Sequence, residues 1–130
     1  MEQKIEKKDE YIFPFEKLEV WQSAVELADF VLNLMESFPA NRCCRLVGQM
    51  EAAVSGVAQK VAEGKGRHNN KEFISFLYSA KSSLFEMLTL TKILERRGFI
   101  KGREEKEIKR QAEIIDRKLY ALINFLKDKN

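Results

Sequence analysis

A ten-residue stretch gathers the side chains of this sequence that are best suited to binding an anion. The segment VAEGKGRHNN, residues 61–70, carries two glycines, a lysine, an arginine and the single histidine of the chain. The G-x-x-x-x-G-K-[ST] spacing of a nucleotide-binding loop is absent from it. The same residues suit a plain turn, in which Gly64 ends one helix, Gly66 takes a left-handed backbone and Asn69 or Asn70 begins the next helix.

Phosphate contact is the functional alternative for this stretch. Basic residues lie around the glycines and beside the first N–H groups of the following helix, which favour anions. This first basic cluster consists of Lys60, Lys65, Arg67, His68 and Lys71. An ion pair between Glu63 and Arg67 would cross the turn, but it would contribute little if exposed. The sequence supports both the turn and the anion contact.

A second basic cluster spans the next predicted turn, in the segment ERRGFIKGREEK, residues 95–106. Its cations are Arg96, Arg97, Lys101 and Arg103, and three glutamates offset them. A solvated surface of mixed charge is the simpler interpretation of this composition. If consecutive helices alternate in direction, the two clusters lie at opposite ends of the molecule.

Catalytic and metal-binding patterns are weak in this sequence. The histidine lies among basic residues, and the Glu-x-x-His motif of di-iron bundles is absent. Cys43 and Cys44 are adjacent and have no second cysteine pair, so we expect no zinc site and one or both thiols buried as small apolar groups. Asp29 and Asp116 lie off the apolar stripes. We expect a protein that is not an enzyme and that binds no cofactor or metal.

Four long segments carry apolar residues at the alternating three- and four-residue steps of an amphipathic helix. They span about 20–37, 41–63, 70–97 and 102–126. The predicted core positions are Trp21, Ala24, Ala28, Val31 and Met35; Val47, Met50, Val54, Val57 and Val61; Phe73, Leu77, Ala80, Leu84, Met87, Thr91 and Leu94; and Ile108, Ala112, Ile115, Leu119, Leu122 and Leu126. Short connections between such helices predict an all-α, antiparallel up-down four-helix bundle.

Local signals mark the ends of these helices. Asn41 is a plausible N-cap for the second, Asn69 with Glu72 three residues later resembles a capping box for the third, and Gly98 suits the C′ position after it. The second helix also contains Gly48, along with Gly56 and several alanines. Interior glycine is ~1 kcal/mol less favourable than alanine, so these positions indicate close backbone approach. Either the other three helices enclose this helix, or part of it contacts another subunit.

The segment YIFPFEKL, residues 11–18, predicts an extended arm that is too apolar to be left in water. It either folds back over its own bundle or lies across a neighbouring chain. We therefore divide the sequence into an N-terminal arm, residues 1–15, and a four-helix bundle domain, residues 16–130.

Composition sets wider bounds on the function. The chain has 130 residues, of which 45% are hydrophobic and 33% charged, which is typical of one globular domain. Its net charge of +3 permits an acidic partner without requiring one. The N-terminus, MEQKIEKKDE, has no apolar signal region, and no apolar run is long enough to span a membrane. We expect a cytoplasmic protein.

Several segments together resemble a known family. They are FEKLEVWQSAVELADFV, the dipeptide FP, VAEGKGRHNNKEFISFLYSAKSSLFEMLTL and LERRGFI. Over roughly residues 15–126, the chain resembles the four-helix bundle proteins encoded in intervening sequences of bacterial 23S rRNA genes. That family is similar to the accessory (variability determinant) proteins of diversity-generating retroelements, which partner a reverse transcriptase.

The resemblance implies a ring-like homo-oligomer, commonly a pentamer, without catalytic residues. For the retroelement branch it implies binding of template RNA and of the reverse transcriptase. The second helix departs from the family, with Glu51 and Ala52 where basic residues are common, and Val57 and Ala58 where Ile-Pro is common. Five copies would multiply the charge and could form one basic ring that attracts RNA or DNA. The alternative is a protein-interaction scaffold with no nucleic-acid role.

Overall fold

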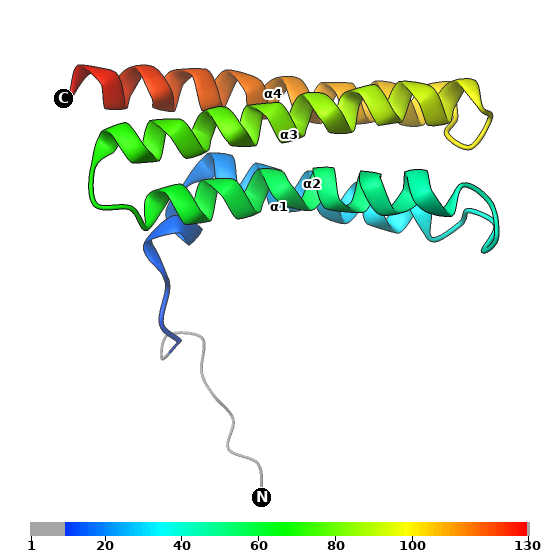
Figure 1. Cartoon of the computed structure of the whole chain (residues 1–130), viewed down its shortest axis with the longest axis horizontal. Coiled ribbons are helices and arrows are strands. Elements are labelled where there is room, and N and C mark those ends of the chain that lie inside the picture. The colour runs from blue at the N-terminus through cyan, green and yellow to red at the C-terminus, as the bar shows by residue number, and fades with distance from the viewer. Residues whose placement is uncertain (1–9, 130) are drawn as a thin grey trace, which may run out of the picture.

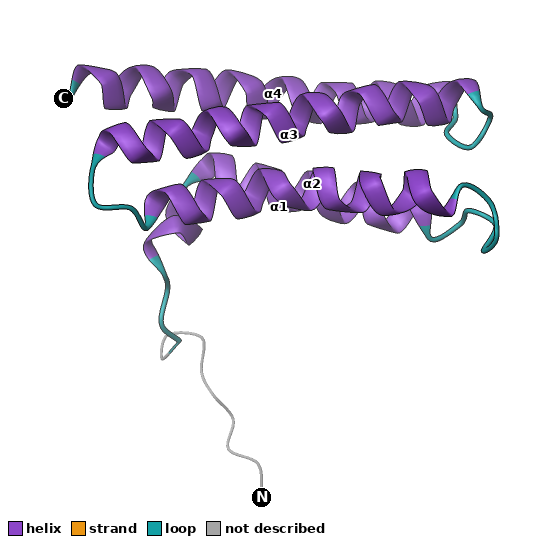
Figure 2. Ribbon diagram, in the orientation of Figure 1, coloured by secondary structure: helices purple, strands orange, loops and turns teal. Residues whose placement is uncertain are grey.

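The computed structural model describes residues 10–129, and it is built from four long helices and one short 3₁₀ helix. In chain order these are η2 (Pro14–Lys17), α1 (Glu19–Met35), α2 (Cys44–Lys65), α3 (Asn70–Arg96) and α4 (Gly102–Asp128). Figure 2 shows helices and loops, with no strand in the described part of the chain. The predicted all-α class is confirmed.

Consecutive helices run in opposite directions, and each packs against two neighbours around the bundle (Figure 1). Helix α2 packs on α1 and α3, and α4 packs on α3 and α1. Between residues 10 and 129, the diagonal pair α2 and α4 has no close backbone contact. The up-down bundle is therefore confirmed. Enclosure of α2 by the three other helices is wrong, because α4 lies diagonally across the core.

The α3 stripe forms the centre of the core, and all seven of its predicted positions are buried. The buried face of α1 is rotated from the prediction. Val20 and Leu27 are buried, whereas Trp21 and Ala28, one position later in each case, are only half-buried. Trp21 is free to lie at the edge of the core because the ring of Phe15 covers it, with 5.2 Å between the ring centroids.

Two further core positions differ from the prediction. Val47 is half-buried because it lies in the first turn of α2, near the end of the bundle. In α4, Ile123 is buried and Leu122 only half-buried. Both residues fit the three- and four-residue steps between Leu119 and Leu126, so the periodicity alone does not choose between them.

The start of α2 also differs from the prediction. Asn41 lies in the loop, and the N-cap is Cys43, whose backbone is left-handed with φ 58°. Cys43 is half-buried against the core, while Cys44 is exposed and donates its thiol to the carbonyl of Ala40 at 3.4 Å. Burial of the thiols is therefore only partial. The Gly98 prediction is confirmed, since this residue has φ +86° after the end of α3.

The N-terminal arm is only partly extended. Pro14 fixes its own φ, and the carboxylate of Glu16 accepts the backbone N–H of Phe13 at 2.9 Å, so residues 14–17 form the 3₁₀ helix η2. This helix packs against α1 and α2, which places that part of the arm on its own bundle. Tyr11, Ile12 and Phe13 remain exposed.

The helix-two glycines have different roles. A Cβ atom built on Gly56 would lie 3.0 Å from the Ser83 hydroxyl oxygen, so α2 approaches α3 closely there. Gly48 is exposed, with nothing within 4 Å of a built Cβ, and the prediction of close approach at that position is wrong.

Candidate nucleic-acid interface

The turn between α2 and α3 is built on a close contact at Gly64. This residue is buried in the last turn of α2, where a Cβ atom would lie 2.7 Å from Cβ of Phe76 and 2.9 Å from Cδ1 of Phe73. The prediction that Gly64 ends this helix is wrong, because α2 continues past it and ends at Lys65. The predicted left-handed backbone at Gly66 is wrong, because its φ is −82°. Gly64 therefore serves packing, whereas Gly66 is the exposed C-cap of α2.

The beginning of α3 is capped as predicted. The side chain of Asn69 accepts the backbone N–H of Glu72 at 2.8 Å. One of the first free N–H groups of α3 is therefore already satisfied by the protein.

The cations of the first basic cluster lie around this turn, at one end of the bundle. Lys60 is half-buried and the other four residues are exposed. The Arg67 guanidinium lies 4.5 Å from the centroid of the Phe76 ring, and the Lys65 ammonium lies 5.9 Å from that of Phe73. Both are within cation–π range. The predicted ion pair between Glu63 and Arg67 does not form, and no member of this cluster pairs with a carboxylate of residues 10–129.

The second basic cluster surrounds the α3–α4 turn, at the opposite end of the bundle (Figure 1). Its four members are exposed. Lys101 is the N-cap of α4, and its backbone N–H donates to the Glu104 carboxylate at 2.8 Å. The two clusters do not form one continuous surface within a single chain, as the alternation of helix direction predicted.

Arg42, which the sequence pattern did not indicate, lies beside the second cluster. The Arg42 guanidinium lies 5.2 Å from the ring centroid of Phe99, and the Phe99 ring packs at 5.6 Å on Phe38. These contacts join the α1–α2 loop to the α3–α4 loop. The alternation of helix direction could have indicated this contact, because it places both loops at the same end of the bundle.

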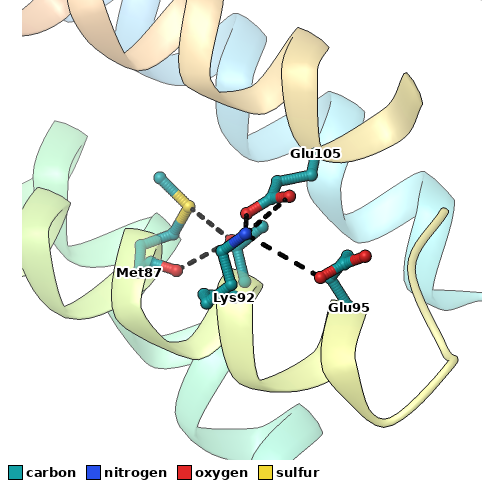
Figure 3. A network of polar contacts seen from close by, with 5 residues as sticks. Met87, Lys92, Glu95 and Glu105 are labelled. Carbon is teal, nitrogen blue, oxygen red and sulfur yellow. Dashed lines mark hydrogen bonds and ion pairs between the residues drawn. The ribbon is translucent and has the colours of Figure 1, made fainter. Parts of the chain in front are cut away.

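A polar network between α3 and α4 was also missed. Figure 3 shows the Lys92 ammonium between two carboxylates, with distances of 2.9 and 3.1 Å to the oxygens of Glu105 and 3.8 Å to Glu95. Glu105 is only 9% exposed. The neighbouring Thr91 hydroxyl donates to the carbonyl of Met87 at 2.8 Å. Two of the three glutamates expected to offset the second cluster therefore hold Lys92 instead.

Glu107, on the surface of α4, has a lowered pKa. The Glu107 carboxylate accepts two hydrogen bonds from Arg110, at 2.7 and 3.0 Å, and one from Gln111 at 2.8 Å. The hydrogen bonds from Arg110 chiefly, and then that from Gln111, lower the pKa of Glu107 to about 2. This arrangement is a surface ion pair within one helix.

Residues 10–129 contain no group of three or more His, Cys, Asp or Glu side chains placed to hold a metal ion. None of the helices formed by these residues combines the length and apolar character that crossing a bilayer requires.

Comparisons with known proteins agree with the bundle. The sequence matches the 23S rRNA-intervening sequence protein family over residues 16–121. A crystal structure at 1.70 Å resolution of a protein with unknown function, from the S23 ribosomal protein family of Bacteroides thetaiotaomicron, is similar with a TM-score of 0.65 and 18% identity. The match covers 80% of this chain and 97% of that one, and it shows a shared fold. No functionally curated protein matches. The chain belongs to the 23S rRNA-intervening sequence protein family.

Proposed function

We propose that this protein is not an enzyme and that it binds structured RNA or a ribonucleoprotein through the first basic cluster, at the α2–α3 turn. The observation that carries the proposal is that most cations of this cluster are exposed and that they are unpaired within residues 10–129. Lys65, Arg67 and Lys71 are exposed, and none of them pairs with a carboxylate of residues 10–129. Such side chains contact phosphates and position a nucleic acid without reading its sequence.

Aromatic rings support the same role by limiting where two of these charges can be. Arg67 lies over the half-buried Phe76, and Lys65 lies near the buried Phe73. A cation that already rests on a ring loses less conformational freedom when it meets a phosphate. The contacts of Arg67 and Lys65 with these rings therefore support a phosphate-binding role for the turn.

Charge reversal at the two turns tests this proposal. The variant Lys65→Glu with Arg67→Glu should bind structured RNA more weakly, and the slope of log affinity against log salt should fall by about two units, because two phosphate contacts are lost. The matched variant Arg97→Glu with Arg103→Glu changes the charge equally at the opposite end and should have the smaller effect. Filter binding across a salt series measures both, with circular dichroism as a check on folding. Equal losses in the two variants would show that total charge, and not this turn, governs binding.

A narrower version of the proposal concerns partners. We propose that the protein is a homo-oligomer, with a pentamer as the specific expectation, and that it serves as an accessory subunit of a retroelement reverse transcriptase. The resemblance of the VAEGKGRHNN turn and the flanking helices to that group of proteins supports it. Copurification with a reverse transcriptase encoded next to this gene would test the partnership, and light scattering would give the number of subunits.

A protein-interaction scaffold without a nucleic-acid role is the second candidate. The exposed apolar side chains of Tyr11, Ile12 and Phe13 favour it, since such a patch suits contact with protein. RNA binding by the wild-type protein separates the two candidates. Lack of retention of RNA even at low salt would leave the scaffold as the better explanation.

A further inference from the structure

The N-terminal arm presents aromatic rings that are held in place and yet exposed. Four rings form an aromatic series, with centroid distances of 4.8 Å from Tyr11 to Phe13, 5.9 Å from Phe13 to Phe15 and 5.2 Å from Phe15 to Trp21. The series begins in solvent and ends against the bundle, since Tyr11 is 73% exposed and Phe13 54% exposed, whereas Phe15 and Trp21 are half-buried. The two outer residues therefore keep more than half of their surface open to a further ring.

The arm leaves the bundle at the end that carries the first basic cluster. Helix α1 begins at Glu19, and α2, which runs in the opposite direction, ends at Lys65, so both points lie at the same end (Figure 1). Helix η2, at the base of the arm, packs against α1 and α2. Exposed rings and exposed cations are therefore gathered at one end of the molecule.

The charges at this end divide between the turn and the arm. From residue 60 to residue 72 the turn carries four lysine or arginine side chains and two glutamates, Glu63 and Glu72. In η2, Lys17 is exposed and pairs with no carboxylate of residues 10–129, and Glu16 accepts a backbone N–H of the arm at 2.9 Å. Glu10 is exposed at the start of the arm, where it would repel a phosphate. An anionic chain would therefore place its phosphates on the turn and its uncharged groups on the arm.

We propose that the rings of Tyr11 and Phe13 stack with unpaired bases of an RNA whose phosphates lie on the first basic cluster. Surfaces that bind single strands combine these two features, because every base has a flat π-face and every linkage carries a charge. Bases inside a duplex are already stacked on one another, so the arm would select single-stranded segments next to the structured part of an RNA. The inference rests on the RNA binding proposed above and adds to it the class of segment that is bound.

Two RNA hairpins with the same stem test the inference. One has a tail of about eight unpaired adenines, a length within the range that single-strand sites hold. The other has an abasic tail of equal length, which keeps the phosphates and removes the bases. Because stacking alone distinguishes the two tails, the wild-type protein should bind the adenine-tailed hairpin roughly 5- to 100-fold more tightly in filter binding.

Variants of the arm assign this preference to its rings. Tyr11→Leu with Phe13→Leu keeps the apolar bulk, so a contact with protein would survive it, but it removes the rings. It should bind both hairpins as the wild type binds the abasic one, with an unchanged salt slope because no phosphate contact is lost. Tyr11→Phe should retain the preference. The matched control Phe85→Leu alters a ring of α3 that is 49% exposed and lies outside the arm, and it should also retain the preference.

The possible results separate the inference from the proposal beneath it. A wild-type protein that binds neither hairpin would overturn both. Equal binding of the two hairpins would overturn base stacking alone and leave the phosphate contact standing. A preference that persists in the folded double variant, or an equal weakening on both hairpins, would show that the arm does not recognise bases. Should circular dichroism reveal misfolding of the double variant, Tyr11→Leu alone, at the most exposed ring, must lower the preference if the inference is right.

Discussion

The two basic ends of the bundle differ in what their carboxylates do. At the α3–α4 turn, Glu104 caps the backbone of Lys101, and Glu105 with Glu95 holds Lys92. At the α2–α3 turn, Glu63 and Glu72 form no ion pair with any residue in the range 10–129.

The aromatic residues differ between the ends as well. The ring of Phe99 lies under the Arg42 guanidinium and packs on the ring of Phe38, so it joins two loops. The ring of Phe76 lies under the guanidinium of Arg67, which belongs to the adjacent turn. The α3–α4 end thus uses three glutamates and Phe99 to hold Lys101, Lys92 and the adjoining loop, although its own four cations are exposed and, like those of the α2–α3 end, pair with no carboxylate of residues 10–129. Similar composition at the two turns therefore comes with different contacts of the carboxylates and aromatic rings.

Substitution of Gly64 should have the largest effect on stability. In Gly64→Ala, the added Cβ would meet Phe76 at 2.7 Å and Phe73 at 2.9 Å, so the end of α2 must move away from α3. We expect the free energy of unfolding in urea to fall by roughly 1–3 kcal/mol. The control Gly48→Ala, with open space around its Cβ, should raise it by about 0.5–1 kcal/mol. An equal response at both glycines would mean that the α2–α3 turn has no special packing requirement.

The ion pair at the other end should have an intermediate effect. The substitution Glu105→Gln removes the buried charge that holds Lys92. We expect the free energy of unfolding to fall by about 1 kcal/mol. Glu113→Gln removes an exposed partner of Arg117 and should change stability by less than about 0.5 kcal/mol. Thermal and urea unfolding of both variants provide the comparison. If the two losses were the same, the Lys92 network would be no more important to the α3–α4 end than an ordinary surface pair.

The smallest expected effect is a pH dependence near the α3–α4 end. Because the pKa of Glu107 is lowered from 4.5 to about 2, its contribution to stability is fully present above the unfolded value of 4.5. That contribution is lost as the pH falls toward about 2. Stability of the wild type should therefore decline more steeply than that of Glu107→Gln below pH 4.5. Arg110→Gln should show the same reduced slope, and a wild-type slope in that variant would point to a different acid.

Sequence periodicity predicted the bundle because each helix must bury one face, and α3 follows this rule at every position named. It was less reliable in α1, where the core residue Leu27 and its neighbour Ala28 both fit the repeat. The sequence did not show that Phe15 of the arm packs on Trp21, which lies at the edge of the core in this tertiary contact.

The candidate site was predictable in part for the same reason. The basic residues of both turns are visible in the sequence, and the alternation of helices placed them at opposite ends. The sequence does not show which charged residues pair with one another or with an aromatic ring. Lys92 and Glu105 are 13 residues apart, and Arg42 meets Phe99 from a different loop, so only the packed bundle shows which charges are already engaged.

The aromatic series that links the arm to the bundle gives the protein a built-in optical reporter. Trp21 is the sole tryptophan of the chain, and its indole is half-buried beneath Phe15. Lifting η2 from the bundle would wet the indole and shift its emission to longer wavelength, while the helical ellipticity would persist. Fluorescence can thus follow release of the N-terminal segment separately from melting of the four helices.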